Sequence, residues 1–160
     1  MGSDLVAIRE FRRSLRALER EVELSLVSQT ECCGVTSAQC HILLEIEARG
    51  NASVGELAVA LELDPSTLSR ASDALVKAGL VSRADDPANR RRQILALLPA
   101  GTAKVEYINR ACDEYYESVL AEAEGPRRSA IAETITYLAR AIRSKRLAGG
   151  SCCPVEKPKE

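Results

Sequence analysis

Residues 53–101 read SVGELAVALELDPSTLSRASDALVKAGLVSRADDPANRRRQILALLPAG, and this stretch predicts a short helix, a tight turn, a longer helix and a hairpin. Ser53 and Glu56 have the spacing of a capping box, in which each side chain accepts a hydrogen bond from the other residue's backbone amide. The first helix is therefore expected to begin at this box. Asp64 and Pro65 indicate the start of the second helix, because aspartate caps free amides and proline has no amide to leave unsatisfied.

The second predicted helix carries small and charged side chains on its outer face. Its apolar residues recur three or four positions apart until Gly79 ends the helix, which leaves an outward face of Ser66, Thr67, Ser69, Arg70, Asp73 and Lys77. Small hydroxyl residues near a helix start, with an arginine one turn later, fit the major groove of DNA without steric conflict. An ordinary solvated face would be richer in glutamate and lysine. We therefore expect this helix to read DNA bases.

A basic hairpin is predicted directly after this helix. Two strand-like runs, residues 80–83 and 93–97, flank a segment of turn residues that ends in Arg90, Arg91 and Arg92. Together with Arg83, these arginines predict a wing with a cationic tip that contacts the DNA backbone. A lone run of arginines is more often a solvated turn, but here it follows a helix-turn-helix pattern, which favours DNA binding.

These residues resemble the MarR family of winged-helix transcriptional regulators, and the likeness covers roughly residues 5–147. The wing carries its most specific part: Asp86-Pro87-Ala88-Asn89-Arg90-Arg91, followed by Leu97, Pro99 and Gly101, is close to the family pattern Asp-Pro-x-Asp-Arg-Arg leading to Leu-Thr-x-x-Gly. Asn89 stands where an aspartate usually braces the wing arginine, and Leu98 stands where a threonine usually caps the next helix. The resemblance implies a homodimer whose terminal helices interlock, with a winged helix on each side.

The expected fold class is mainly α (α+β), a winged helix-turn-helix with a two-stranded wing and N- and C-terminal dimerisation helices. The apolar stripes of residues 4–28, 99–123 and 127–147 are too long for one small winged helix to cover, so they are expected to bury one another across a two-fold axis. Two recognition helices then meet the half-sites of a palindromic double-stranded operator about one helical turn apart. The predicted division is 1–34, dimerisation helix and Cys-Cys turn; 35–98, winged helix; 99–147, C-terminal dimerisation helices; and 148–160, a flexible cysteine-containing tail.

The composition limits the classes of function. The formal net charge is −1, so any affinity for nucleic acid has to come from a local basic patch. The sequence has no apolar run as long as a membrane span and no apolar N-terminal signal, which predicts a soluble cytoplasmic protein without a membrane partner. The sole histidine has no carboxylate–nucleophile constellation and no Gly-rich phosphate loop is present, so an enzyme is not expected.

The six cysteines need an explanation, because a reducing cytoplasm keeps thiols from forming a disulfide framework. Cys112 falls on an apolar helical stripe and is predicted to be a core residue. Cys40 borders an apolar face and is either a core residue or a ligand. The other four form adjacent pairs that packing does not explain, Cys32-Cys33 in a predicted interhelical turn and Cys152-Cys153 in the terminal arm.

Soft thiolates bind soft ions, so the two cysteine pairs predict a sensor site for a metal or metalloid. Arsenite, As(III), is the leading candidate, because Cys32, Cys33 and one or both of Cys152 and Cys153 can supply three thiolates in a pyramid. The other candidates are Sb(III), Cd, Hg, Cu(I), Zn and an Fe–S cluster. The competing hypothesis is a redox sensor, in which one thiolate is oxidised and a second cysteine closes a disulfide.

Three functional hypotheses remain. The preferred one is a dimeric DNA-binding regulator, a repressor released from its operator by a soft ion on cysteine thiolates. A thiol-based redox-sensing repressor would use the same sulfur atoms. A winged helix that only binds other proteins is the third, and salt-dependent binding of a palindromic duplex would separate it from both repressors.

Overall fold

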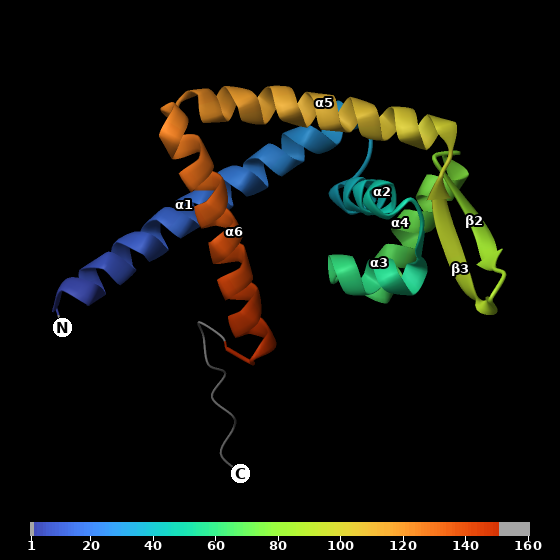
Figure 1. Ribbon diagram of the computed structural model, residues 1–160, viewed down its shortest axis with the longest axis horizontal. Coiled ribbons are helices and arrows are strands. Elements are labelled where there is room, and N and C mark those ends of the chain that lie inside the picture. Colours follow the sequence, from blue (N-terminus) through green and yellow to red (C-terminus); the bar gives the residue numbers. More distant parts are fainter. Residues whose placement is uncertain (1, 151–160) are drawn as a thin grey trace, which may run out of the picture. The chain divides into compact units, whose positions relative to one another are not determined.

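The computed structural model describes residues 2–150, apart from the side chains of residues 2–3, 26–32 and 90–91. The chain divides into two compact units, Met1–Arg110 and Ala111–Glu160, and the helix α5 runs through the boundary. Figure 1 shows the elements along the chain. They are α1 (Gly2–Cys33), α2 (Ser37–Arg49), β1 (Ala52–Ser53), α3 (Val54–Leu61), α4 (Pro65–Lys77), β2 (Val81–Asp86), β3 (Asn89–Leu97), α5 (Pro99–Ala121) and α6 (Gly125–Leu147).

The core of the first unit lies where α2, α3, α4 and the sheet meet the first half of α5. Each element contributes aliphatic side chains at the spacing of its own period, so the same residues that form a helix or strand face also fill the core. The buried side chains include Ile42, Leu43, Ile46, Leu57, Leu68, Leu75, Val81, Leu95, Val105 and Ile108. This core holds α3 and α4 against each other, which confirms the predicted helix-turn-helix.

Local capping chemistry explains where these helices begin and end. Ser53 and Glu56 form the predicted capping box, since the Ser53 amide donates to Glu56 Oε2 over 2.8 Å and the Glu56 amide donates to Ser53 Oγ over 3.2 Å. Asp64 Oδ1 accepts from the Ser66 amide over 2.9 Å and so caps α4. Gly79, with φ +68°, ends α4 as predicted, and the Leu80 amide then donates to the Leu75 carbonyl over 3.1 Å.

The sheet has three antiparallel strands in the order β1-β3-β2, one strand more than the predicted two. The short strand β1 pairs Ala52 with Leu95, and two residues are too few to show an alternating pattern in the sequence. The wing strands are also longer than predicted, because β2 and β3 continue through polar residues and leave only Pro87-Ala88 at the tip. The three arginines therefore lie on β3 and not in the turn.

The helix α1 is longer than predicted, which moves the first cysteine pair. We expected the helix to stop near residue 28, but it continues through Cys33 and ends before Gly34, whose φ is +65°. Threonine, glutamate and cysteine cost a helix only a few tenths of a kcal/mol each, so glycine is the first residue here that ends it. Cys32 and Cys33 thus belong to the last helical turn, and the expected interhelical position was wrong.

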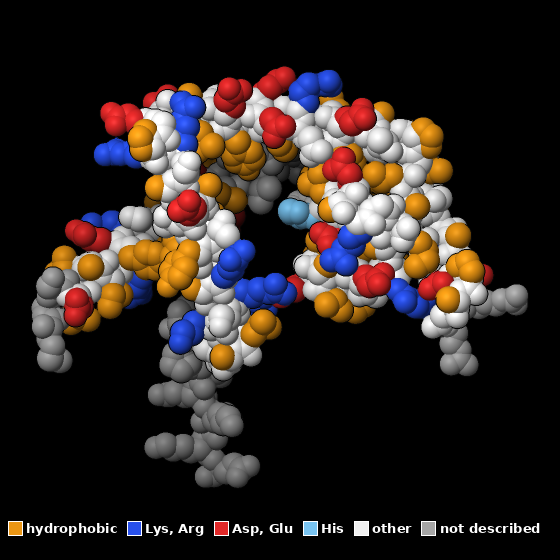
Figure 2. All heavy atoms as spheres, viewed as in Figure 1, with side chains coloured by type: hydrophobic (Ala, Val, Ile, Leu, Met, Phe, Trp, Pro, Cys, Tyr) orange, Lys and Arg blue, Asp and Glu red, His pale blue; other side chains and the backbone are white. Residues whose placement is uncertain are grey.

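The second unit consists of the last part of α5 and the whole of α6. The helix α6 begins at Gly125, two residues before the predicted start, because Pro126 fits the first helical turn. Large apolar side chains along it are open to solvent in this single chain, and Figure 2 shows hydrophobic side chains exposed along α6. Among them, Ile131, Ile135 and Ile142 are 38%, 51% and 49% exposed.

Candidate nucleic-acid interface

The recognition helix α4 presents a polar face at its N-terminal end. Ser66, Ser69 and Arg70 are exposed there, and Thr67 is half-buried. The carboxylate of Asp64 accepts from the Ser66 hydroxyl and from the amides of Ser66 and Thr67, which lowers the pKa of Asp64 below its usual value of 3.8. Asp64 is thus anionic at neutral pH and holds the first turn of the helix in a defined geometry.

Arg70 lies along the surface of α4 and reaches back towards the start of the helix. Its Nε donates to the Ser66 carbonyl over 3.2 Å, and its Nη2 donates to Ser66 Oγ over 3.2 Å. A guanidinium group has five N–H donors, so these two bonds position it while leaving donors for another acceptor. Arg70 is thereby held at the end of the helix that enters a major groove in helix-turn-helix proteins.

Asp73 and Arg83, both predicted to contact DNA, are bound to each other in the structure. Arg83 Nη1 lies 2.7 Å from Asp73 Oδ1, and both side chains are half-buried. The pair connects the middle of α4 with the strand β2. Its position indicates that it holds the wing hairpin against the recognition helix. Lys77, in contrast, is exposed at the last turn of α4.

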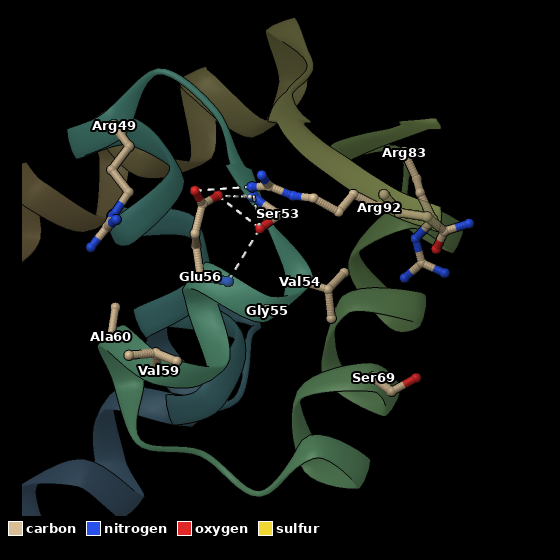
Figure 3. A pocket seen from close by; sticks show the side chains of 11 residues that line it. Arg49, Ser53, Val54, Gly55, Glu56, Val59, Ala60, Ser69, Arg83 and Arg92 are labelled. Carbon is tan, nitrogen blue, oxygen red and sulfur yellow. Dashed lines mark hydrogen bonds and ion pairs between the residues drawn. The ribbon is translucent and has the colours of Figure 1, made fainter. Parts of the chain in front are cut away.

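Arg92 extends from β3 to the start of α3, as Figure 3 shows. Its Nη2 lies 3.0 Å from Ser53 Oγ and 3.0 Å from Glu56 Oε1, and its Nε lies 3.7 Å from Asp86 Oδ2. The Ser53 amide, the Ser53 hydroxyl and Arg92 together lower the pKa of Glu56 from 4.5 to about 2. The Glu56–Arg92 pair is therefore fully charged at neutral pH, and Arg92 has its partners within the protein.

A hollow of about 830 Å³ opens beside these residues. Figure 3 shows it between the N-terminal end of α3, the first turns of α4 and the wing. Its lining includes Ser69 from the recognition helix and the guanidinium groups of Arg83 and Arg92 from the wing strands. The region between recognition helix and wing is thus concave, and its lining combines the Glu56 carboxylate with the arginines Arg83 and Arg92, which form ion pairs within the protein.

Known proteins share this architecture. Residues 35–92 match the model of the MarR family. Over 118 residues, 72% of this chain and 76% of the relative, the sequence is 30% identical to the HTH-type transcriptional repressor MdtR of Bacillus subtilis strain 168. The protein belongs to the MarR family.

Solved structures agree with this assignment. The YusO protein of Bacillus subtilis is similar, with 25% identity, a TM-score of 0.66 and coverage of 84% of this chain and 95% of that one. A mutant of S. aureus MepR bound to an oligodeoxyribonucleotide has the same fold, with 19% identity, a TM-score of 0.57 and coverage of 82% and 97%. The MarR-family protein is accordingly a DNA-binding transcriptional regulator and not an enzyme, as the sequence predicted. Within residues 2–150, no helix is long and apolar enough to span a membrane.

The predicted DNA contacts of the wing are only partly visible in this MarR-family protein. The backbones of Arg90 and Arg91 belong to β3, next to the two-residue tip, but their side chains lie outside the described residues. Their predicted contact with DNA stays a prediction. Arg92, which follows them, turns towards α3 as described above.

The predicted thiol site also lies largely outside the described part of this MarR-family protein. Cys152, Cys153 and the side chain of Cys32 are beyond it, and Cys33 is half-buried at the end of α1. Where the structure does describe side chains, it shows no group of three or more His, Cys, Asp or Glu placed to hold a metal ion. The four-cysteine site therefore stays a prediction. Cys40 and Cys112 are both half-buried, so neither is a fully buried core residue.

Two structural roles in this MarR-family protein were missed by the sequence analysis. Glu56 was identified only as a capping residue, although it also pairs with Arg92. Lys104 of α5 donates to the Cys33 carbonyl over 3.2 Å and so binds the C-terminal end of α1, which has no basic residue in its last turn. Both contacts join residues far apart in the chain, and no local pattern in the sequence indicates them.

Proposed function

We propose that this MarR-family regulator acts in the cytoplasm as a homodimer that represses transcription from a palindromic operator and leaves it when a soft ion binds its cysteines. The face of α4 carries the DNA-binding part of the proposal. Capped by Asp64 and displaying Ser66, Ser69 and Arg70, it combines small side chains with one well-positioned guanidinium group. The relative MdtR is itself a repressor, which supports repression here.

Dimer formation is supported by apolar side chains that one chain leaves uncovered. Along α1, Leu5, Ile8, Phe11, Leu18 and Val22 are 45–56% exposed. Along α6, three isoleucines are exposed in the same way. Soluble monomers rarely keep long apolar stripes in water, so a second copy is the natural partner for both helices.

The proposed contacts divide the work between helix and wing. Arg70, with Ser66, Thr67 and Ser69, reads base edges, because the start of a recognition helix is the part that reaches the floor of the major groove. Arg90 and Arg91 bind phosphate or the minor groove, and Lys77 adds a phosphate contact. The affinity for DNA then depends on the base contacts and on the phosphate contacts, but the preference for one DNA sequence depends on the base contacts of the helix alone.

Arg70→Ala is expected to weaken operator binding by about 1–3 kcal/mol, roughly 5- to 150-fold, and to reduce the preference for operator over random DNA. Arg90→Ala is the comparison, since it should weaken both duplexes alike and lower the salt slope by about one. Fluorescence anisotropy with both duplexes at several salt concentrations measures these quantities. Equal losses on both duplexes for both variants would contradict the division of work.

The thiol part of the proposal rests on two adjacent cysteine pairs and on the position of the first. Cys32 and Cys33 end α1, where Lys104 connects the Cys33 carbonyl to α5. The helix α5 in turn begins two residues after β3, and the Leu98 amide between them donates to the Leu80 carbonyl over 2.9 Å. An ion that joins Cys32 and Cys33 to the tail pair thus acts on a helix end connected to the DNA-binding unit. As(III) is the leading ion, since three thiolates suit it.

Operator release by arsenite is expected to disappear when either cysteine pair is replaced by serine. In the parent, the ion should weaken operator binding by about 5- to 150-fold, the usual range of allosteric coupling. The measurement is operator affinity of the parent, Cys32→Ser/Cys33→Ser and Cys152→Ser/Cys153→Ser with arsenite, antimonite, cadmium and peroxide. Cys112→Ser is the control and should respond like the parent.

The outcomes separate the alternatives. If both double variants respond as the parent does, the sensor assignment is wrong. If only peroxide releases the parent from DNA, the protein is a redox-sensing repressor and not a sensor of a soft ion. If the parent binds no palindromic duplex at low salt, the chain is a winged helix that binds other partners.

A further inference from the structure

We propose that Arg92 and Glu56 form a clamp that holds the wing in the position needed for operator binding, so that Arg92 acts on DNA affinity as a positioning residue. This inference rests on the proposed function, and it gives Arg92 a role different from the phosphate contact predicted by the sequence. Glu56, a carboxylate beside a DNA-binding surface, becomes a residue that favours binding. Simple charge complementarity predicts the opposite for any carboxylate near DNA.

Beyond the Arg83–Asp73 pair, the described side chains give the outer half of the wing few other attachments. Val81 and Leu95 at its base are buried, but the side chains of Ala84, Asp85, Ala88, Asn89 and Gln93 are exposed. Among the described side chains, packing therefore holds the base of the hairpin and not its outer part. An isolated two-stranded hairpin is only marginally stable in water, so its direction depends on the contacts that tie it to the rest of the unit.

Arg92 supplies that tie at the place where packing stops. One of its nitrogens is shared between Ser53 Oγ and Glu56 Oε1, both at 3.0 Å, and Ser53 is 4% exposed at the N-terminal end of α3. The same guanidinium lies 3.7 Å from Asp86 at the end of β2. Arg92 therefore connects both wing strands to the first turn of α3, an element whose own position the core fixes through Leu57.

The Glu56 carboxylate is committed to this contact. It accepts from the Ser53 amide over 2.8 Å and from the Ser53 hydroxyl over 2.7 Å, and these bonds orient its second oxygen towards Arg92. A phosphate group that binds Arg92 would have to share the guanidinium with this oriented, charged partner, which already balances its charge. The arrangement is that of an internal ion pair, and a DNA contact through Arg92 would work against it.

The clamp is tested by whether one substitution, Glu56→Gln, raises or lowers the affinity for the operator. Glu56→Gln keeps a capping-box acceptor, since glutamine serves at this position, but removes the ion pair and makes the interface more positive by one charge. If Arg92 is a free DNA contact, all duplexes should bind more tightly. If the clamp positions the wing, operator affinity should fall about fivefold, the effect of a well-placed surface ion pair.

The matched control is Asp85→Asn, which removes one negative charge from the exposed part of β2 without touching the clamp. It should bind operator as tightly as the parent or more so. Arg92→Ala should lose as much as Glu56→Gln, and the double variant should lose no more than either alone, because both remove one contact. Arg92→Lys should recover part of the loss. Thermal unfolding of each variant shows whether it is folded.

Hydrogen exchange of the wing amides in the DNA-free protein provides the second measurement. Glu56→Gln and Arg92→Ala should both exchange faster than the parent across residues 84–93, while Asp85→Asn should not. Tighter operator binding by Glu56→Gln, or unchanged exchange in both clamp variants, would overturn the inference. Failure of the parent to bind operator would overturn the proposed function instead, and the exchange result would still decide whether the clamp exists.

Discussion

Gly101→Ala is expected to destabilise the winged helix by about 3 kcal/mol, because no side chain fits at this position. A Cβ atom on Gly101 would lie 2.0 Å from the Leu80 carbonyl oxygen and 3.0 Å from its carbon. Both are backbone atoms, so no flexible side chain can move aside. The same carbonyl accepts from the Leu98 amide over 2.9 Å, a bond that joins the residue before β2 to the residue after β3 at the base of the wing.

Thermal unfolding measures this effect. For a chain of this size, a loss of about 3 kcal/mol corresponds to a fall in Tm of roughly 6–12 °C. Gly55→Ala is the matched control, since a Cβ there meets no atom within 4 Å and Gly55 lies in the first turn of α3. It should be neutral or stabilising by about 0.5–1 kcal/mol, because alanine restricts the unfolded chain. Equal Tm values for the two variants would refute the close-approach explanation.

Gly101 also shows what the sequence did contain. It was recognised only as part of the resemblance to the wing pattern of the MarR family, and the structure supplies its physical reason, the contact with Leu80. The helix-turn-helix itself was predictable because its signals are local. Ser53 with Glu56, and Asp64 with Pro65, each satisfy free amides of a helix start within a few residues.

The sequence failed to predict two features of the fold, the end of α1 and the strand β1. Residues 29–33 mix good helix formers with poor ones and contain no breaker, so the end of α1 was placed too early, and Gly34 sets it instead. The strand β1 exists only because Ala52 and Ser53 pair with Leu95 and Ile94 of β3, which lie far later in the chain. Pairing of this kind depends on the folded core and leaves no pattern in a two-residue stretch.

The candidate site divides in the same way. Residue types on the outer face of α4 were predictable, because a helical period places Ser66, Ser69 and Arg70 together. The partners of those residues were not. Arg83 was assigned to DNA, yet it binds Asp73, and Arg92 binds Glu56, because strand register brings each arginine beside an acid on another element. Charge alone cannot distinguish a DNA contact from an internal ion pair.

Ile135→Glu is expected to split the proposed dimer and to weaken operator binding about 100-fold or more. Ile135 is 51% exposed on α6 in a single chain, so glutamate there leaves the monomer folded. In a dimer the same carboxylate would be buried against apolar side chains, which costs several kcal/mol without a partner charge. Two linked recognition helices gain about 10²- to 10⁴-fold over one, and the monomer loses that gain.

Sedimentation velocity at micromolar concentration and operator affinity measure the two effects together. Glu133→Lys is the control, because it changes the charge of the same helix two residues away, at an exposed position off the isoleucine stripe. It should remain dimeric and bind operator at least as well as the parent. If the parent sediments as a monomer, the proposed dimer is wrong. A dimeric Ile135→Glu variant would place the interface elsewhere, and a monomeric variant with parental operator affinity would show that one winged helix suffices for binding.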